Sequence, residues 1–176
     1  GLLDSKVNAM VVMESIDTKD LSVLRQAAMD FLARREHSLH ELRTKLIRKF
    51  PEVSPTLVLA VLSRLKTEGL QSDERYAESR IRYRLERGFG YHHIRNDLIS
   101  KGVDPSRVDQ MLYADDDCWL QKARELIEKR LIPPAGARRR VLACAGPEHR
   151  KLARFLEARG FSKRDIRVAL DAVIAP

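Results

Sequence analysis

Three arginines in the middle of the chain are the side chains best suited to binding chemistry. Arg80, Arg84 and Arg87 follow one another at spacings of four and three residues, so on a helix they share one face. A planar guanidinium group can bind a phosphate or a carboxylate through two parallel hydrogen bonds. Tyr76 and Tyr83 lie beside this ridge. The pattern predicts either a binding ridge for an anionic partner or a solvated helix face.

Further basic residues extend the pattern beyond this ridge. Arg95 and Lys101 follow on the next predicted helix, and Arg138, Arg139 and Arg140 form a run that we expect to be a mobile basic loop. The formal net charge is +8 and the isoelectric point is about 9.8. Such an excess indicates an anionic partner, which is a nucleic acid, an acidic protein face or a membrane surface.

Catalytic and metal-binding patterns are absent from the sequence. It contains no Gly-rich phosphate loop, no HExxH and no GxSxG. His92 and His93 are adjacent on a predicted helix, so their side chains point apart and cannot both bind one metal ion. Cys118 and Cys144 have no metal-ligand spacing, and we expect free thiols in a reducing cytoplasm. We therefore expect no enzyme activity, no metal and no cofactor.

The elements that must position the basic residues are helices, and they recur. A helix start, an apolar pair four residues apart, a basic residue and a short turn occur three times. Aligning Leu42, Ile94 and Leu152 gives offsets of 52 and 58 residues. A long period filled with helix is typical of an array of small helical units. No segment shows the alternation of a β-strand, and no apolar run approaches the roughly 18 residues of a membrane span.

Helix-start signals divide the chain into segments. Ser38 with Glu41 forms a capping box, and Ser54-Pro55 and Asp104-Pro105 each place a cap before a proline in the first turn. We expect an all-α fold of three tandem three-helix repeats, arranged in a line rather than rolled into one bundle. The predicted boundaries are a flexible segment at 1–20, repeats at 21–69, 70–113 and 114–176, and a basic loop at 132–146 within the last repeat.

The central segment resembles the RecX family. The resemblance is carried by the run from Gly69 to Ala77, and then by Arg84, Gly88, Gly90, Ile94, Leu98, Lys101 and Gly102. The first repeat matches the family at Ser38, Glu41, Leu42, Lys45 and Leu46, and the third at Leu156, Arg159, Gly160 and Phe161. Together the matches cover about residues 24 to 174. Within the central motif we expect Asp73, Tyr76 and Ala77 to shape a helix junction, with Gly88 and Gly90 forming the turn.

This resemblance implies a cytoplasmic regulator of the RecA recombinase with an elongated, curved and positively charged body. Such proteins lie in the groove of the RecA–DNA filament and limit its ATPase and strand exchange, and thereby recombination and the SOS response. The implied partners are the RecA filament and, weakly or indirectly, single-stranded DNA, with no membrane and a monomeric state. We expect contact through Arg80, Arg84, Arg87, Arg95, Lys101 and Arg138 to Arg140.

Two other functions remain open at this stage. A free-standing DNA-binding protein of helix-turn-helix type would place one short helix of a repeat in the major groove. Few residues suited to base reading are present on those helices, Asn96 and Gln110 among them. A helical subunit of a cytosolic enzyme is the third possibility, and a ligand-dependent activity or an ordered metal would be needed to support it.

Overall fold

The computed structural model describes residues 1–131 and 146–174, and for residues 7–17 the backbone alone. The described residues form nine helices and no strand, so the predicted all-α class is confirmed. Arg138, Arg139 and Arg140 lie outside the described residues. Two compact units divide the chain: the first holds residues 1–77 with 101–103, and the second holds 78–100 and 104–176. No described helix is both long and apolar enough to cross a membrane.

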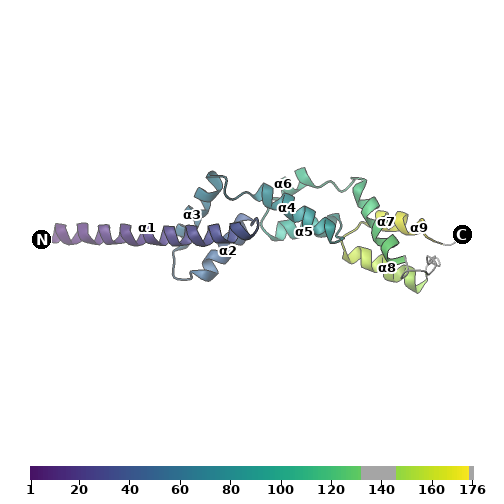
Figure 1. The fold of residues 1–176 in the computed structure, drawn as a ribbon, viewed down its shortest axis with the longest axis horizontal. Helices are drawn as coiled ribbons and strands as arrows, with labels where there is room; N and C mark the ends of the chain where they lie inside the picture. Colours follow the sequence, from purple (N-terminus) through teal and green to yellow (C-terminus); the bar gives the residue numbers. More distant parts are fainter. Residues whose placement is uncertain (132–145, 175–176) are drawn as a thin grey trace. The chain divides into compact units, whose positions relative to one another are not determined.

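The first unit is built from α1 (Leu2–Arg34), α2 (Leu39–Lys49) and α3 (Pro55–Thr67) (Figure 1). The predicted caps are present: Ser38 Oγ accepts from the Glu41 amide at 3.1 Å, and the Glu41 carboxylate accepts from the Ser38 amide at 3.3 Å. Each helix contributes one apolar stripe to a shared core. That core contains Leu24, Ala27, Ala28, Leu42, Leu46, Val58, Val61, Leu62 and Leu65.

The start of α1 differs from the sequence-based prediction of a boundary near residue 20. Helix α1 runs without interruption from Leu2 to Arg34, and its N-terminal part continues past α2 and α3 in Figure 1. The residues at the expected break are Asp17, Thr18, Lys19 and Asp20. None of them is a glycine or a proline, so nothing in their backbone chemistry ends a helix.

The middle of the chain forms α4 (Asp73–Glu86), α5 (Tyr91–Ser100) and α6 (Pro105–Met111). Among the apolar residues of these helices, the buried ones include Tyr76, Ala77, Ile94, Leu98 and Val108, as their helical spacing indicates. Helix α4 begins in the first unit and continues in the second from residue 78. It ends before Gly88, whose φ of 82° is the left-handed conformation of a helix C-terminus.

The last three helices are α7 (Cys118–Leu131), α8 (Pro147–Ala158) and α9 (Lys163–Asp171). Helix α9 packs against both α7 and α8. Their core contains Ala123, Ile127, Leu131, Leu152, Leu156, Phe161, Ile166, Ala169 and Leu170. Ser162 accepts from the amide of Asp165 at 3.1 Å and so caps α9.

Within the second unit, two glycines bring the start of α5 against the turn between α8 and α9. The Gly90 amide donates to the Arg159 carbonyl at 2.7 Å, and the His92 amide donates to the Gly160 carbonyl at 3.0 Å. A Cβ atom added to Gly90 would lie 2.8 Å from the carbonyl carbon of Gly160. Gly90 is therefore required by the approach of another backbone rather than by an unusual φ angle.

Candidate interaction surface

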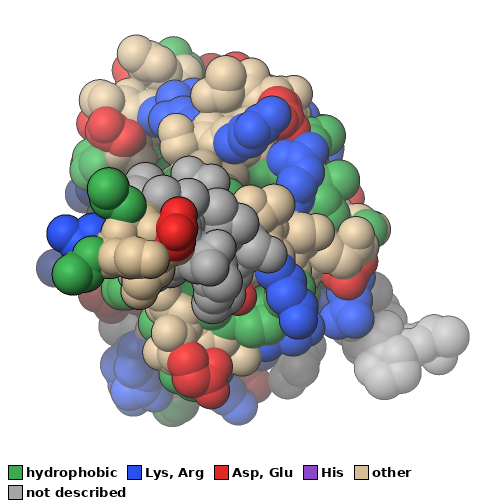
Figure 2. Space-filling view, turned by 90° about the vertical axis from the view of Figure 1, so that its left-hand side faces the viewer, with side chains coloured by type: hydrophobic (Ala, Val, Ile, Leu, Met, Phe, Trp, Pro, Cys, Tyr) green, Lys and Arg blue, Asp and Glu red, His purple; other side chains and the backbone are tan. Residues whose placement is uncertain are grey.

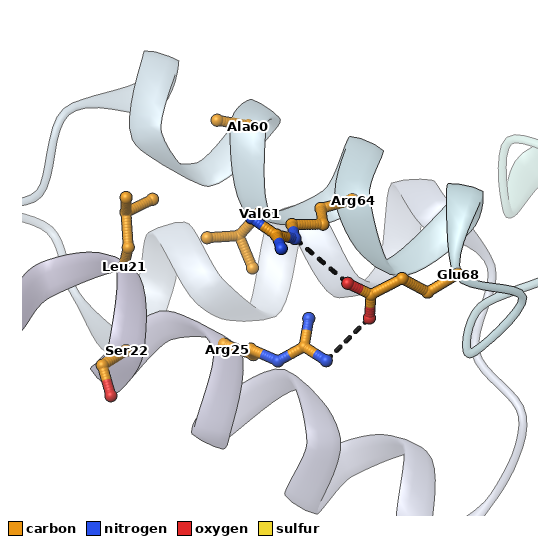
Figure 3. Close-up of a pocket in the computed structure, with 7 residues that line it drawn as sticks. All are labelled: Leu21, Ser22, Arg25, Ala60, Val61, Arg64 and Glu68. Atoms are coloured by element: carbon orange, nitrogen blue, oxygen red, sulfur yellow. Dashed lines mark hydrogen bonds and ion pairs between the residues drawn. The ribbon is translucent and has the colours of Figure 1, made fainter. Parts of the chain in front are cut away.

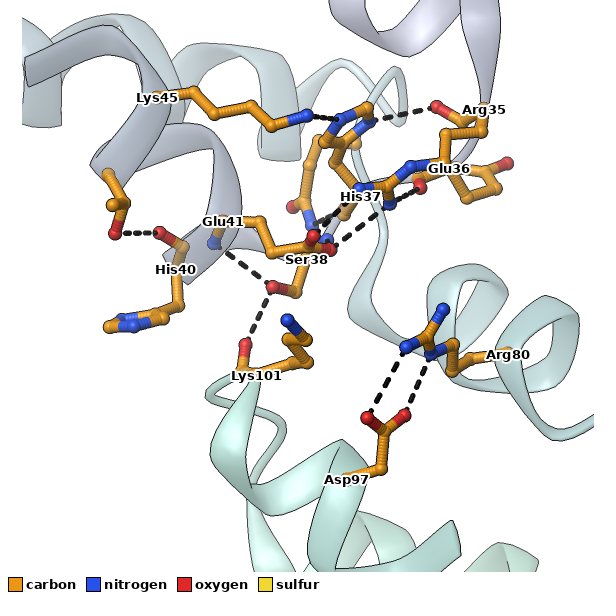
Figure 4. Close-up of polar contacts among 12 residues, drawn as sticks. Arg35, Glu36, His37, Ser38, His40, Glu41, Lys45, Arg80, Asp97 and Lys101 are labelled. Atoms are coloured by element: carbon orange, nitrogen blue, oxygen red, sulfur yellow. Dashed lines mark hydrogen bonds and ion pairs between the residues drawn. The ribbon is translucent and has the colours of Figure 1, made fainter. Parts of the chain in front are cut away.

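Arg80 and Arg84 of the predicted arginine ridge lie on α4, Arg87 directly follows its last residue, Glu86, and two of the three arginines face α5. Arg80 Nε donates to Asp97 Oδ2 at 2.7 Å, and Arg80 Nη2 donates to Asp97 Oδ1 at 3.3 Å. Arg84 Nη2 lies 3.5 Å from the same Asp97 Oδ1. The side chains of Arg80 and Arg84 are 23% and 21% exposed, and that of Asp97 is 12% exposed. Figure 4 shows the pair of Arg80 and Asp97. With Arg84, one carboxylate faces two cations, which leaves this cluster with a net positive charge.

Aromatic rings hold the guanidinium groups of the ridge. Arg87, Arg80 and Arg84 lie 4.5, 5.5 and 5.9 Å from the ring centroid of Tyr83, which itself is exposed. Arg84 also lies 5.0 Å from the ring of Phe89. A cation over an aromatic face is attracted by the ring without losing its charge. The rings therefore orient these arginines and leave them able to bind an anion.

The same alternation continues through α8 and α7. Arg159 lies 4.6 Å from the centroid of Phe89 and 5.1 Å from that of Phe155, and Arg130 lies 3.6 Å from Phe155. Arg159 Nη1 also donates to the carbonyl of Arg87 at 2.8 Å. We call this set the arginine–aromatic row. Its members are Arg87, Tyr83, Arg84, Phe89, Arg159, Phe155 and Arg130.

Two buried nitrogens beside the row have no hydrogen-bond partner among the described residues. They are Arg84 Nε and His93 Nε2, and the His93 ring stacks on Phe89 with centroids 4.0 Å apart. Burial lowers the pKa of His93 and the cationic Arg84 lowers it further, while Asp97 opposes them. His93 is therefore neutral at pH 7, and the positive charge of this region comes from the arginines.

The other predicted contact residues lie in different surroundings. Arg95 Nε donates to Asp109 Oδ1 at 3.2 Å, with the Arg95 side chain 32% exposed. Lys101 belongs to the first unit, where its carbonyl accepts from Ser38 Oγ at 2.6 Å. Its ammonium group makes no ion pair within the described residues. The structure thus brings Arg80, Arg84 and Arg87 together and places Arg95 in a separate pair.

Five members of the row are not among the predicted contact residues. Phe89, Phe155 and Arg130 have no role in the sequence-based prediction, Tyr83 is placed only beside the ridge, and Arg159 enters only through the family resemblance. Their partners are distant in sequence, as Arg159 and Arg87 are 72 residues apart. A helical period identifies residues on one face of one helix. It therefore cannot predict contacts between residues of different helices, such as the contact between Arg159 and Arg87.

Basic side chains elsewhere are more evenly distributed. On the face shown in Figure 2, blue Lys and Arg side chains are spread among red Asp and Glu side chains and green hydrophobic ones. The arginine–aromatic row differs because each of its cations contacts an aromatic ring, and Arg84 alone of them is also paired with a carboxylate, that of Asp97, among the described residues. We therefore take the row as the candidate interaction surface.

The residues of the predicted helix junction lie in the first unit. Asp73 Oδ1 accepts from the Leu39 amide at 2.8 Å and from Gln71 Nε2 at 2.9 Å. Tyr76 and Ala77 are buried. Asp73 therefore satisfies an otherwise free amide at the start of α2, which is a contact that orders this end of the helix.

His37 is a buried titratable group at the same junction (Figure 4). Its Nδ1 lies 3.0 Å from the Arg35 carbonyl and its Nε2 lies 2.8 Å from Lys45 Nζ. An ammonium group can only donate, so Nε2 accepts and Nδ1 carries the proton that is donated to the carbonyl. Burial lowers the pKa of His37, and Arg35 and Lys45 lower it further, while the Arg35 carbonyl and Glu41 oppose them. The folded state therefore favours the neutral form of His37.

We predict that acid destabilises the first unit through His37. Because the pKa of His37 is lower in the folded state than in the unfolded state, the unfolded state binds a proton first, and stability falls as pH drops below about 6.5. The loss is on the order of 1 kcal/mol for each unit of pKa difference. Urea unfolding at pH 7.5 and pH 5.5 measures it, with His37→Gln as the variant that cannot titrate. An equal loss of stability in both proteins would contradict the assignment.

Comparison with known proteins agrees with this architecture. Family models described as the first and second three-helix domains of RecX match residues 25–65 and 72–112. The chain is 37% identical to the regulatory protein RecX of Pseudomonas fluorescens over 81% of this chain and 86% of that protein. It is 38% identical to the regulatory protein RecX of Halorhodospira halophila over 85% of this chain and 87% of that protein.

A solved structure shows the same fold. The crystal structure of RecX from Lactobacillus salivarius superposes with a TM-score of 0.70. It covers 89% of this chain and 97% of the crystallised chain, at 21% sequence identity. At that identity the likeness concerns the fold alone.

Proposed function

Because this chain belongs to the RecX family, whose members are non-enzymatic regulators of the RecA recombinase, we propose that it binds the RecA–single-stranded DNA filament and limits its ATPase and strand exchange. The observation that supports this most directly is the arginine–aromatic row. Its guanidinium groups come from α4, α7 and the end of α8, and rings orient them without neutralising them. Such a surface suits the phosphates of DNA and the carboxylates of an acidic protein face.

The mechanism that follows is multivalent. Each guanidinium contact is weak alone, but several on one protein act together, because the first contact raises the effective concentration of the others. Of the predicted contact residues, Arg84 and Arg87 belong to the arginine–aromatic row and Arg80 adjoins it through the shared partner Asp97, with Arg95, Lys101 and Arg138 to Arg140 as further contacts. Wherever phosphates are contacted, affinity falls steeply with salt.

The first experiment measures the ATPase rate of RecA on single-stranded DNA while this protein is added at far less than one copy per recombinase subunit. We expect inhibition at these low ratios, because a protein that acts on a filament affects many subunits. An electrophoretic control shows that the free DNA is not sequestered. An unchanged rate together with tight binding to naked duplex DNA would overturn the proposal in favour of a helix-turn-helix-type DNA-binding protein.

Charge reversal at the exposed ends of the row tests the surface. We predict that Arg87→Glu combined with Arg130→Glu raises the inhibitory concentration at least about tenfold, because two cations become anions that repel phosphate or carboxylate. Neither arginine forms an ion pair within the described residues, so helicity by circular dichroism should be unchanged. Arg124→Glu with Arg167→Glu is the matched control, since both are exposed in the same unit. Equal effects of the two double variants would exclude the row as the contact site.

A further inference from the structure

A hollow on the first unit is independent of the arginine–aromatic row. It lies between α1 and α3 and has a volume of about 500 Å³, which is within the range of ligand-binding pockets. Leu21 of α1 and Ala60 and Val61 of α3 supply its apolar lining, and Arg25 and Arg64 stand at its edge (Figure 3). Apolar and cationic side chains thus line one hollow.

Glu68 connects the two arginines of this hollow. Arg25 Nη2 donates to Glu68 Oε2 at 2.7 Å, and Arg64 Nε donates to Glu68 Oε1 at 3.0 Å. Figure 3 shows both guanidinium groups turned toward this carboxylate. The side chains of Arg25 and Arg64 are 41% and 78% exposed. Exposed ion pairs of this kind contribute little to stability.

The two guanidinium groups retain most of their binding capacity. Each has five N–H donors, and the contacts with Glu68 use one donor of Arg25 and one of Arg64. Two cations and one carboxylate leave a net positive charge beside the apolar lining. Glu68 therefore makes the contacts that the carboxylate of a ligand would make, and the remaining N–H donors of Arg25 and Arg64 are not used by it.

We propose that this hollow is the docking site of an acidic peptide segment, which places an apolar side chain between Leu21 and Val61 and a carboxylate on Arg25 and Arg64. The complementarity of charge argues for an anion, and the apolar lining argues for a peptide. A nucleic-acid backbone offers phosphates but no aliphatic side chain to fill the hollow. An incoming carboxylate shares or displaces the contacts of Glu68, so Glu68 acts as an internal competitor.

The probe is a fluorescein-labelled twelve-residue peptide of Asp, Glu and Leu, titrated with the full chain by fluorescence anisotropy. We expect Arg25→Gln with Arg64→Gln to weaken binding roughly tenfold, because two charge-assisted contacts are removed. Arg43→Gln with Arg48→Gln is the matched control, because these exposed arginines lie on α2 of the same unit. Ser22→Trp fills the hollow without changing any charge and should also weaken binding.

Glu68→Gln separates a docking role from a structural one. Removing the internal competitor frees both guanidinium groups, so binding of the acidic peptide should strengthen several-fold, whereas a purely structural ion pair would give no gain. A peptide with serine in place of leucine should bind at least about tenfold more weakly, since it has no apolar side chain to bury against the lining of the hollow. Unchanged or weaker binding by Glu68→Gln, equal binding of the serine peptide, or displacement of the probe by an oligonucleotide would each overturn the proposal. None of these outcomes depends on inhibition of RecA.

Discussion

Replacing Gly90 with alanine should destabilise the second unit by at least about 3 kcal/mol. The added Cβ would lie 2.8 Å from the Phe161 nitrogen and 2.9 Å from the Gly160 oxygen. These are backbone atoms, so no side-chain rotation can relieve the overlap. Separating the segments would also break the hydrogen bonds from the Gly90 and His92 amides, which are 2.7 and 3.0 Å long. Urea unfolding followed by circular dichroism measures the change in free energy.

Gly69→Ala is the matched control for this substitution. Gly69 has a φ of 74°, but a Cβ there would meet nothing within 4 Å. Its replacement should therefore cost only about 1–2 kcal/mol, which is the strain of a left-handed alanine. If the two variants were destabilised equally, the close approach of the backbones at Gly90 would not be the reason for that glycine.

Local chemistry explains why much of the fold could be predicted. Ser38 with Glu41, Ser54 with Pro55 and Asp104 with Pro105 each start a helix through contacts within four residues, and the structure has a helix after each of them. The apolar spacing likewise identified the buried positions Leu42, Ile94 and Leu98. Caps and periods are short-range features, so a sequence displays them directly.

Long-range partners explain why the candidate surface could be predicted only in part. The spacing of Arg80 and Arg84 placed them on one face, but nothing in α4 shows that Asp97 of α5 faces them. The sequence pattern predicts that Gly90 is part of a turn, whereas the structure requires a glycine there because of Gly160, which lies 70 residues further along the chain. Such contacts form only when the helices pack against one another. The number of residues between the two partners follows no regular spacing, so the sequence pattern does not reveal them.

The surroundings of the arginines suggest a division of roles within the ridge. Asp97 holds Arg80 and Arg84 in the half-buried part of α4, and Tyr83 and Phe89 cover their guanidinium planes. Arg87 is exposed and its guanidinium group contacts a ring. We infer that Arg80 and Arg84 contribute mainly positive potential and rigidity, while Arg87 makes direct contact with the partner. A rigid array loses less conformational entropy on binding than free arginine side chains do.

Reversing the charge of Asp97 should therefore be among the most damaging substitutions on this surface. Asp97→Lys would place a third cation beside Arg80 and Arg84, whose nitrogens lie 2.7 and 3.5 Å from the present carboxylate. Removing one partner of a buried ion pair costs about 3–5 kcal/mol, and repulsion between like charges adds to this. Urea unfolding should show this loss, and added salt should restore part of it by screening the repulsion.

Two further variants test whether the loss of stability in Asp97→Lys arises because the cluster of Asp97, Arg80 and Arg84 is buried. Asp109→Lys reverses the charge of the partner of Arg95, but the Asp109 side chain is 55% exposed, so its ion pair is screened by water and the loss should be small. Asp97→Asn keeps the shape of the side chain and removes the charge, so it should fall between the two lysine variants. Equal stability of Asp97→Lys and Asp109→Lys would mean that Arg80 and Arg84 do not depend on Asp97. In that case the ridge would be free to contact a partner along its whole length, and the division of roles between Arg87 and the other two arginines would be wrong.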